Sequence, residues 1–236
     1  MRSTWAIFKK ELRAYFLSPV AYAVAGVFLL LSGYFFSVIM LTTRTAEMRA
    51  AFGNMSIVLI FVVPLLTMRL LAEEVRQGTA ELLLTCPLRS THIILGKYLA
   101  SLVLYLAMLA MTGIYPWVLL RFGNPDPGPI ISGYLGIFLL GASFLAVGLF
   151  ASSVTDSNIV AAMVAFGLLL LLWVLGWAGE ALGGRLGDVL TSLALFERLN
   201  DFRKGIIDSS NCLHYLSYIV GFLFLAGLGL ERRRWG

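Results

Sequence analysis

The largest group of side chains that could do chemistry together lies in residues 69–97. Four of its charged residues, Glu73, Glu74, Arg76 and Glu81, stand among leucines. Gly78-Thr79 interrupts the run, which predicts two short helical pieces bent at Gly78. A helix that carries acidic and basic residues beside leucines is suited to docking on a protein, whereas a helix that only floats on lipid headgroups is typically basic. We therefore expect a protein partner here, with a floating amphipathic helix as the alternative.

Gly96-Lys97 suggests a phosphate-binding loop, but the rest of that motif is missing. The motif requires a glycine where Thr91 stands and a serine or threonine where Tyr98 stands. Lys97 is therefore interpreted as an anchor that reaches the water at the membrane edge. If ATP drives this protein, a separate polypeptide must bind the nucleotide.

The rest of the chain shows what must position these residues. Six stretches contain no Asp, Glu, Lys or Arg, namely residues 14–43, 50–68, 98–120, 127–155, 157–179 and 209–230. About 20 apolar residues form a helix that crosses the roughly 30 Å hydrocarbon core of a bilayer. A transmembrane barrel would instead alternate apolar and polar residues. The sequence predicts an all-α integral membrane protein with six transmembrane helices.

Composition and charge limit the remaining possibilities. The chain is 59% hydrophobic and 13% charged, so we expect residues 1–236 to form a single transmembrane domain with no soluble domain beside it. The net charge of +5 is attributed to basic residues that flank the spans, and no nucleic acid is expected. The clusters Lys9-Lys10 and Arg232-Arg233-Arg234 lie near the two ends of the chain. Because basic flanks favour the cytoplasm, we predict an N-in, C-in topology.

Residues 2–17 are predicted to form an amphipathic helix before the first span. The residues that define it are Trp5, Phe8 and Leu12 on the apolar face and Lys9, Lys10 and Arg13 mostly on other faces. Such a helix lies in the cytoplasmic interface, with its aromatic side toward membrane lipid and its basic side toward anionic headgroups. Ser18-Pro19 is expected to end it. The alternative is an ordinary basic flank of the first span.

No catalytic or metal centre is predicted. His92 and His214 are expected on opposite faces of the membrane, as are Cys86 and Cys212, so neither pair meets within one chain. Ion-coupled carriers commonly place ionisable residues at membrane depth, but His214 is interpreted as an interfacial hydrogen-bonding residue. The energy for any transport is therefore expected to come from outside the chain.

Several short motifs follow one another in a fixed order along the sequence. They are Phe8-Lys9-Lys10-Glu11-Leu12, Met68-Arg69, Ala72-Glu73-Glu74 with Arg76, Gly78-Thr79, Glu81-Leu82-Leu83-Leu84 with Pro87, Ile94-Leu95-Gly96-Lys97-Tyr98, Phe196-Glu197, Lys204-Gly205-Ile206-Ile207-Asp208 and Glu231-Arg232-Arg233-Arg234-Trp235. Over its whole length the chain resembles the membrane subunit of ABC exporters of the ABC-2 permease class. Within that class it is most similar to the permeases named for gliding motility.

This resemblance implies a role for each segment. Residues 69–97 would be the cytoplasmic coupling loop, with ATPase contacts carried by Glu73, Glu74, Arg76, Gly78, Thr79 and Glu81. Residues 2–17 would be the interfacial helix. Residues 180–208, which include Phe196, Glu197, Lys204, Gly205 and Asp208, would form short re-entrant helices on the outer face. Leu195, Phe196, Leu199 and Phe202 give this outer segment an apolar side.

The resemblance also implies partners. Two copies of a cytoplasmic ABC ATPase would bind ATP and Mg²⁺, so this chain would hold no cofactor and would not itself be an enzyme. A second permease, either another copy or a sister subunit, would complete the pathway in the bacterial inner membrane. An apolar pathway beside the second and fifth spans favours a lipid-like or amphipathic substrate. The alternative is an ATPase-coupled membrane anchor that acts on an envelope partner without moving a solute.

Overall fold

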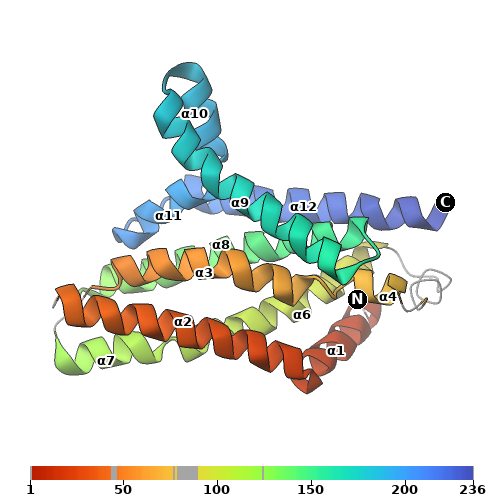
Figure 1. The fold of residues 1–236 in the computed structure, drawn as a ribbon, viewed down its shortest axis with the longest axis horizontal. Helices are drawn as coiled ribbons and strands as arrows, with labels where there is room; N and C mark the ends of the chain where they lie inside the picture. The colour runs from red at the N-terminus through yellow and green to blue at the C-terminus, as the bar shows by residue number, and fades with distance from the viewer. Residues whose placement is uncertain (1, 44–46, 77, 79–89, 124, 236) are drawn as a thin grey trace.

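The structure is a computed structural model, and it describes residues 2–43, 47–76, 78, 90–123 and 125–235. Within these ranges the chain is helical and has no strand, which confirms the predicted all-α class (Figure 1). The helices are α1 (Arg2–Leu17), α2 (Pro19–Thr43), α3 (Arg49–Thr67), α4 (Ala72–Arg76), α6 (Ser90–Met111), α7 (Ile114–Phe122), α8 (Pro127–Val154), α9 (Asn158–Leu182), α10 (Gly184–Leu193), α11 (Leu195–Arg203) and α12 (Ser209–Trp235).

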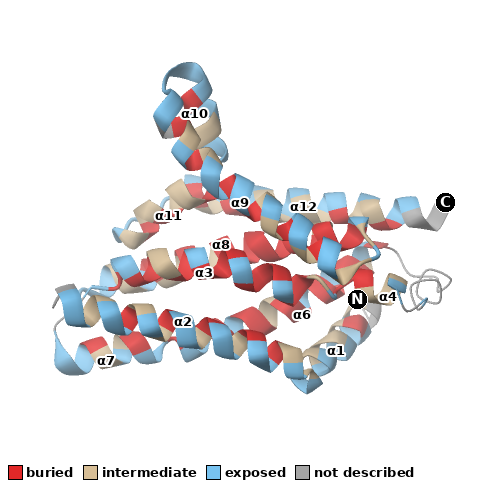
Figure 2. Ribbon diagram, in the orientation of Figure 1, coloured by how far each residue is buried: buried red, intermediate tan, exposed pale blue. Residues whose placement is uncertain are grey.

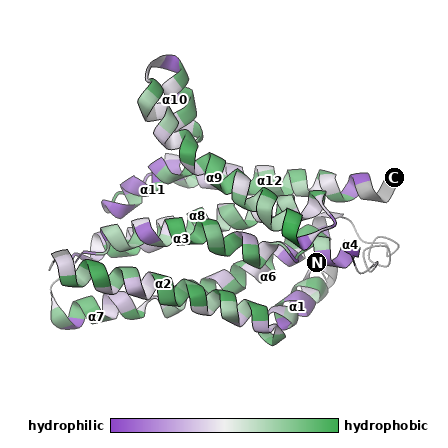
Figure 3. Cartoon of the chain, viewed as in Figure 1, coloured by the Kyte–Doolittle hydropathy of each residue, from purple (hydrophilic) through white to green (hydrophobic). Residues whose placement is uncertain are grey.

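Six helical segments in the described ranges are long and apolar enough to cross a membrane, which confirms the predicted number. They are Pro19–Thr42, Arg49–Arg76, Ser90–Phe122, Pro127–Val154, Asn158–Gly179 and Ser209–Arg232. Hydrophobic residues dominate these segments, and hydrophilic ones gather in α1, α4 and α11 (Figure 3). Both chain ends lie at the same end of the bundle, called the terminal end below (Figure 1). Which side of the membrane this end faces stays a prediction.

Proline and aspartate set two of the helix boundaries. α1 ends at Leu17 and α2 begins at Pro19, as the Ser18-Pro19 pair predicts. Pro127 opens α8, and the side chain of Asp126 accepts a hydrogen bond from the Gly128 N–H at 3.0 Å. This cap satisfies one of the free N–H groups at the start of the helix.

The fourth span, α8, is the centre of the bundle. In its most apolar stretch 83% of the residues are buried, whereas the corresponding share is 22% in α2, 28% in α9 and 17% in α12. The burial along each helix is shown in Figure 2. Glycines let neighbouring helices approach α8 closely, because a Cβ at Gly141 would overlap the Tyr105 ring and one at Gly148 would overlap Thr67. The glycines at these two positions therefore serve helix packing.

The segment 180–208 forms the two short helices α10 and α11. α10 folds back along α9 after a turn at Gly183 and Gly184, whose φ angles of +59° and +63° favour glycine. α11 packs against α8, and three residues of its predicted apolar side, Leu195, Leu199 and Phe202, are buried. The first part of α9 packs on α8 and α3, and the tip of the α9–α10 hairpin projects away from the other helices (Figure 1).

Candidate functional site

The short helix α4 is fastened to the end of α8 by a serine. The backbone N–H groups of Leu71 and Ala72 both donate to Ser152 Oγ at 3.0 Å. The Ser152 hydroxyl in turn donates to the Met68 carbonyl at 3.1 Å. These hydrogen bonds satisfy backbone N–H and C=O groups at the bend between α3 and α4, which have no partner within either helix. The start of the predicted coupling loop is therefore fixed to the centre of the bundle.

A buried lysine lies between two carboxylates beside α4. Lys97 Nζ on α6 is 2.9 Å from Glu11 Oε1 on α1 and 3.0 Å from Glu74 Oε2 on α4. The Lys97 side chain is 1% exposed, and the two glutamate side chains are 12% and 14% exposed. At this depth an unpaired charge would be costly, so the three residues depend on one another.

A fourth charge completes this group. Lys10 Nζ on α1 is 3.1 Å from Glu74 Oε1 and 3.9 Å from Glu11 Oε1. We call Lys10, Glu11, Glu74 and Lys97 the ion-pair cluster, and it joins α1, α4 and α6. The interpretation of Lys97 as a membrane-edge anchor is wrong, because its ammonium lies between carboxylates and does not reach water.

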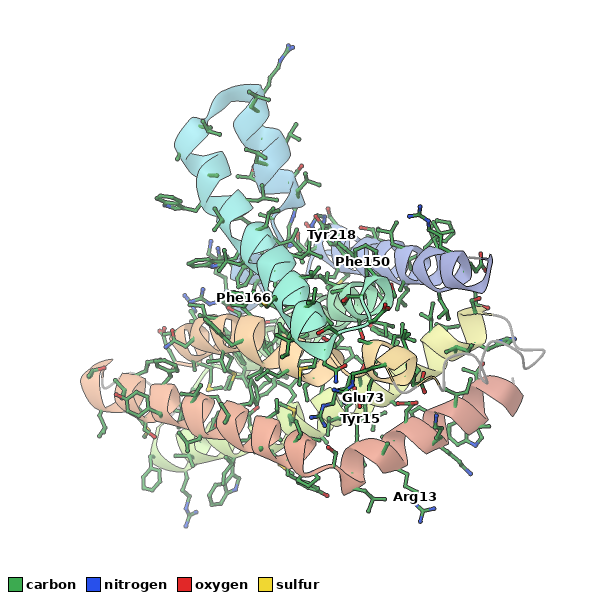
Figure 4. The ribbon with its side chains drawn as sticks, turned by 45° about the vertical axis from the view of Figure 1, so that its right-hand side comes forward. Arg13, Tyr15, Glu73, Phe150, Phe166 and Tyr218 are labelled. Atoms are coloured by element: carbon green, nitrogen blue, oxygen red, sulfur yellow. The ribbon has the colours of Figure 1, made fainter. Side chains whose placement is uncertain are left out.

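Glu73 connects α4 to a different helix. One carboxylate oxygen accepts a hydrogen bond from Arg76 at 2.8 Å, and the other accepts one from the Asn158 amide at the start of α9. Glu73 is labelled at the terminal end in Figure 4. The adjacent glutamates Glu73 and Glu74 thus tie α4 to the fifth span on one side and to α1 and α6 on the other.

The helix α1 packs closely on α6. A Cβ added at Gly96 would lie 2.9 Å from Ile7 Cγ2, so the glycine makes room for Ile7. Thr4 Oγ1 and His92 Nδ1 are 3.1 Å apart, and the Tyr15 hydroxyl donates to the Leu66 carbonyl at 3.0 Å. Burial, with a smaller effect from the Glu11 carboxylate, raises the pKa of Tyr15 well above its ordinary value, so its hydroxyl stays protonated.

The opposite side of α1 remains exposed. Trp5 stacks on Phe8 with ring centroids 5.0 Å apart, and Lys9 Nζ lies 5.5 Å from the centre of the Trp5 ring. Leu12 is half-buried, and Arg13 points away from the bundle (Figure 4). The predicted helix is thus confirmed, while its placement in the membrane interface stays a prediction.

The residues predicted to contact an ATPase divide into two groups. Glu73 and Glu74 pair within the chain, whereas the Arg76 side chain is 63% exposed. Gly78 has a φ of +70°, which agrees with the predicted bend. Thr79, Glu81 and the second helical piece lie outside the described residues. Contact of any of these residues with an ATPase stays a prediction.

The predicted residues of the segment 180–208 lie at the end of the bundle opposite both termini. Phe196 and Glu197 are half-buried on α11, and Lys204 ends that helix. Gly205 has a φ of +94° and lies against Pro129. The Asp208 carboxylate accepts a hydrogen bond from the Ser210 N–H at 2.9 Å, at the start of α12. In this group Phe196 and Glu197 line cavities beside α9.

Sequence reasoning did not connect four of the residues that hold α4 to that helix. Glu11 and Lys97 fall within motifs of the resemblance, but nothing in their spacing pairs them across 86 residues. Ser152 and Asn158 sit at the two ends of the turn between α8 and α9, where small polar residues are ordinary. The one signal in the sequence was a lysine inside a helix that continues into an apolar span, because such a lysine needs an acidic partner.

The fold and the site define a multi-pass α-helical membrane protein in which a short charged segment is clamped to several spans. Among the described residues, no group of three or more His, Cys, Asp or Glu side chains could hold a metal ion. The chain belongs to the ABC-2 family transporter proteins, whose family model matches residues 5–227. It is therefore the membrane component of an ABC transporter, a class that associates with an ABC ATPase subunit. A search of curated proteins finds no match to the chain.

Proposed function

We propose that this chain is the permease subunit of an ABC exporter in the bacterial inner membrane. In this proposal two copies of a cytoplasmic ATPase bind ATP and Mg²⁺, and the permease moves a lipid-like or amphipathic substrate. The observation that carries the proposal is the ion-pair cluster, because it connects the start of the 69–97 segment to α1 and α6 through buried charges.

The cluster supports a mechanical role for α4. Separating a buried ion pair leaves charges without partners, at a cost of about 3–5 kcal/mol, so the paired helices tend to move together. A displacement of α4 by an ATPase would therefore be passed to α1 and α6 through Glu74. The same displacement would be passed to α9 through Glu73 and Asn158. In this proposal Arg76 reaches the ATPase, while Glu73 and Glu74 act as positioning residues.

We further propose that a second permease, either another copy or a sister subunit, completes the pathway. Peripheral α9 presents exposed apolar side chains such as Met163, Leu171 and Trp177, which suit a second permease or lipid. The substrate would pass beside α3 and α9, the second and fifth spans. An apolar wall of this kind suits an amphipathic substrate better than a sugar or an ion.

The test is purification of the tagged chain from its native host in a mild detergent, followed by identification of the proteins that co-purify. We expect a stoichiometric ABC ATPase that is lost from the double variant Glu73→Lys, Glu74→Lys. The control is Asp188→Lys on α10, at a distance from α4, which should keep the ATPase. Recovery of a folded chain without any ATPase would contradict the proposal.

A second assay separates an exporter from an ATPase-coupled membrane anchor. The complex is reconstituted in vesicles, and ATP-dependent movement of labelled lipids between the two leaflets is measured. Movement that stops when the ATPase is inhibited supports an exporter. ATP hydrolysis without movement, together with an envelope protein retained on the segment 180–208, would favour the anchor.

A further inference from the structure

Two cavities meet where α9 diverges from the bundle. The larger, about 530 Å³, is lined by Trp173, Val174, Trp177, Phe196 and Glu197. The smaller, about 350 Å³, lies between α3, α9 and α11. Trp173, Phe196 and Glu197 line both, so the two cavities adjoin at these three residues, and we call the pair the cleft.

The aromatic walls of this cleft have a defined geometry. The Phe196 ring rests on the buried Phe144, with ring centroids 5.7 Å apart. Trp173 meets Phe196 at an interplanar angle of 70°, with ring centroids 6.4 Å apart. Trp177 follows Trp173 by one helical turn and is therefore on the same face of α9. The two tryptophan side chains remain 44% and 73% exposed, so their ring surfaces are available to a ligand.

A carboxylate lies between these walls. Glu197 Oε1 is 3.1 Å from the position that a Cβ on Gly176 would occupy, so the carboxylate faces α9 at Gly176, close to Trp173. Within the described part of the chain, no hydrogen bond or ion pair engages this carboxylate. Two nearby arginines have other partners, because Arg198 donates to Asn211 and Arg203 donates to the Arg49 carbonyl and to Asn200.

This combination of groups selects a particular chemistry. Aromatic faces attract cations, most strongly when water is excluded, and a half-buried carboxylate adds a full negative charge. An anion would be repelled by Glu197, and an uncharged apolar molecule would leave the carboxylate without a partner. We propose that this cleft, which we call the ammonium site, binds an amphiphile through a quaternary or protonated alkylammonium group held between Glu197, Trp173 and Phe196.

The rest of the cleft suits the other parts of such a molecule. Val174 and Trp177 offer an apolar surface to its hydrocarbon chain. Arg203, which also lines the smaller cavity, lies against Gly53 and carries a positive charge, which suits the phosphate of a phospholipid. The site deepens the proposed function, on which it rests, because it names the substrate class as amphiphiles that carry an ammonium group.

The test measures binding of radiolabelled dodecyltrimethylammonium to the purified full chain in nanodiscs of phosphatidylglycerol, a lipid without an ammonium group. We expect saturable binding above that of empty nanodiscs. Glu197→Gln should weaken the affinity by about tenfold or more, and Trp173→Ala by several-fold. Glu197→Asp, which keeps the charge, should retain most of the binding. The matched control is Glu47→Gln, an exposed acidic residue before α3 that lines none of the cavities around Glu197 and should leave the affinity unchanged.

Equal affinities of folded Glu197→Gln and the wild-type chain would overturn the proposal. Dodecanol has the same chain length and no charge. If dodecanol displaced the label as effectively as unlabelled dodecyltrimethylammonium does, the proposal would also be overturned. Identical elution profiles and unfolding temperatures establish that each variant is folded. If Glu197→Gln does not fold, Glu197→Asp and Trp173→Ala still decide the result, and unchanged affinity in Trp173→Ala would contradict the site.

Competition distinguishes the sources of the ammonium group. Displacement of the label by phosphatidylcholine in the nanodisc identifies a membrane lipid, and resistance to it identifies a free alkylammonium amphiphile. Both outcomes support the site. Because the assay contains no ATPase, failure of ATP-driven transport with intact cation binding would refute only the proposed function, and loss of binding with intact transport would refute only the ammonium site.

Discussion

Lys97 on α6 and Glu11 on α1 form an ion pair of 2.9 Å, although 86 residues separate them in the sequence. The lysine is almost fully buried, and a second carboxylate, that of Glu74, lies 3.0 Å from the same ammonium. One cation therefore holds the N-terminal helix, the third span and the start of the coupling segment together. This arrangement makes Lys97 a structural centre of the terminal end.

Lys97→Met should destabilise the protein far more than Lys10→Met. Removing Lys97 leaves two glutamates with little exposure, and breaking a buried pair in this way costs about 3–5 kcal/mol. Lys10 is 63% exposed, and an exposed pair contributes only about 0–1 kcal/mol. Unfolding temperatures of the two variants in the same detergent check this. Equal losses would show that the Lys97 pairs contribute no more than a surface contact.

Reversing the charges of one pair should separate pairing from side-chain shape. Lys97→Glu alone would place three carboxylates together, and Glu11→Lys alone would place three cations around Glu74. The double variant restores two positive and two negative side chains, so we expect it to recover part of the stability that each single variant loses. The measurement is a double-mutant cycle based on unfolding temperatures. The variant Lys10→Gln shows how much a charge change at an exposed position of the same cluster alters the unfolding temperature. Strict additivity of the two losses would rule out direct coupling.

Gly141→Ala should be destabilising, whereas Gly167→Ala should not. A methyl group at Gly141 on α8 would overlap the Tyr105 ring, and overpacking of a core typically costs about 1–3 kcal/mol. The same methyl group at Gly167 on α9 would meet no other atom within 4 Å. At Gly167 the change brings only the higher helix propensity of alanine. Thermal unfolding of both variants decides between them, and similar losses would mean that α8 tolerates movement of its neighbours.

The spans could be predicted from sequence because the bilayer imposes a simple requirement. A helix in hydrocarbon satisfies its own backbone hydrogen bonds and excludes charge, so gaps between charges mark the spans directly. The break before Pro19 and the burial of Leu195, Leu199 and Phe202 follow from equally local rules. These features need no knowledge of which helices touch.

The candidate site could not be predicted in the same way, because it depends on contacts between distant segments. The sequence indicates that Lys97 is an anchor reaching water at the membrane edge, yet its ammonium on α6 is buried between two carboxylates. The predicted coupling role of Glu73 and Glu74 rests on the family resemblance, which does not show that both side chains pair within the chain. The cleft around Glu197 likewise requires the divergence of α9 from α11, which no periodicity encodes.

Glu73→Ala and Gly78→Pro should each lower substrate-stimulated ATP turnover of the assembled complex several-fold. Glu73→Ala removes the hydrogen bonds to Asn158 and Arg76, so α4 loses its side-chain hydrogen bond to α9. Gly78→Pro is incompatible with a φ of +70°, because proline fixes φ near −65°, so the chain must leave α4 in a different direction. Glu47→Ala, an exposed residue before α3, is the control and should leave turnover unchanged. Each variant must first be shown to assemble with the ATPase, since a lost complex would lower turnover for another reason. Unchanged turnover in assembled complexes of both variants would mean that α4 does not transmit movement.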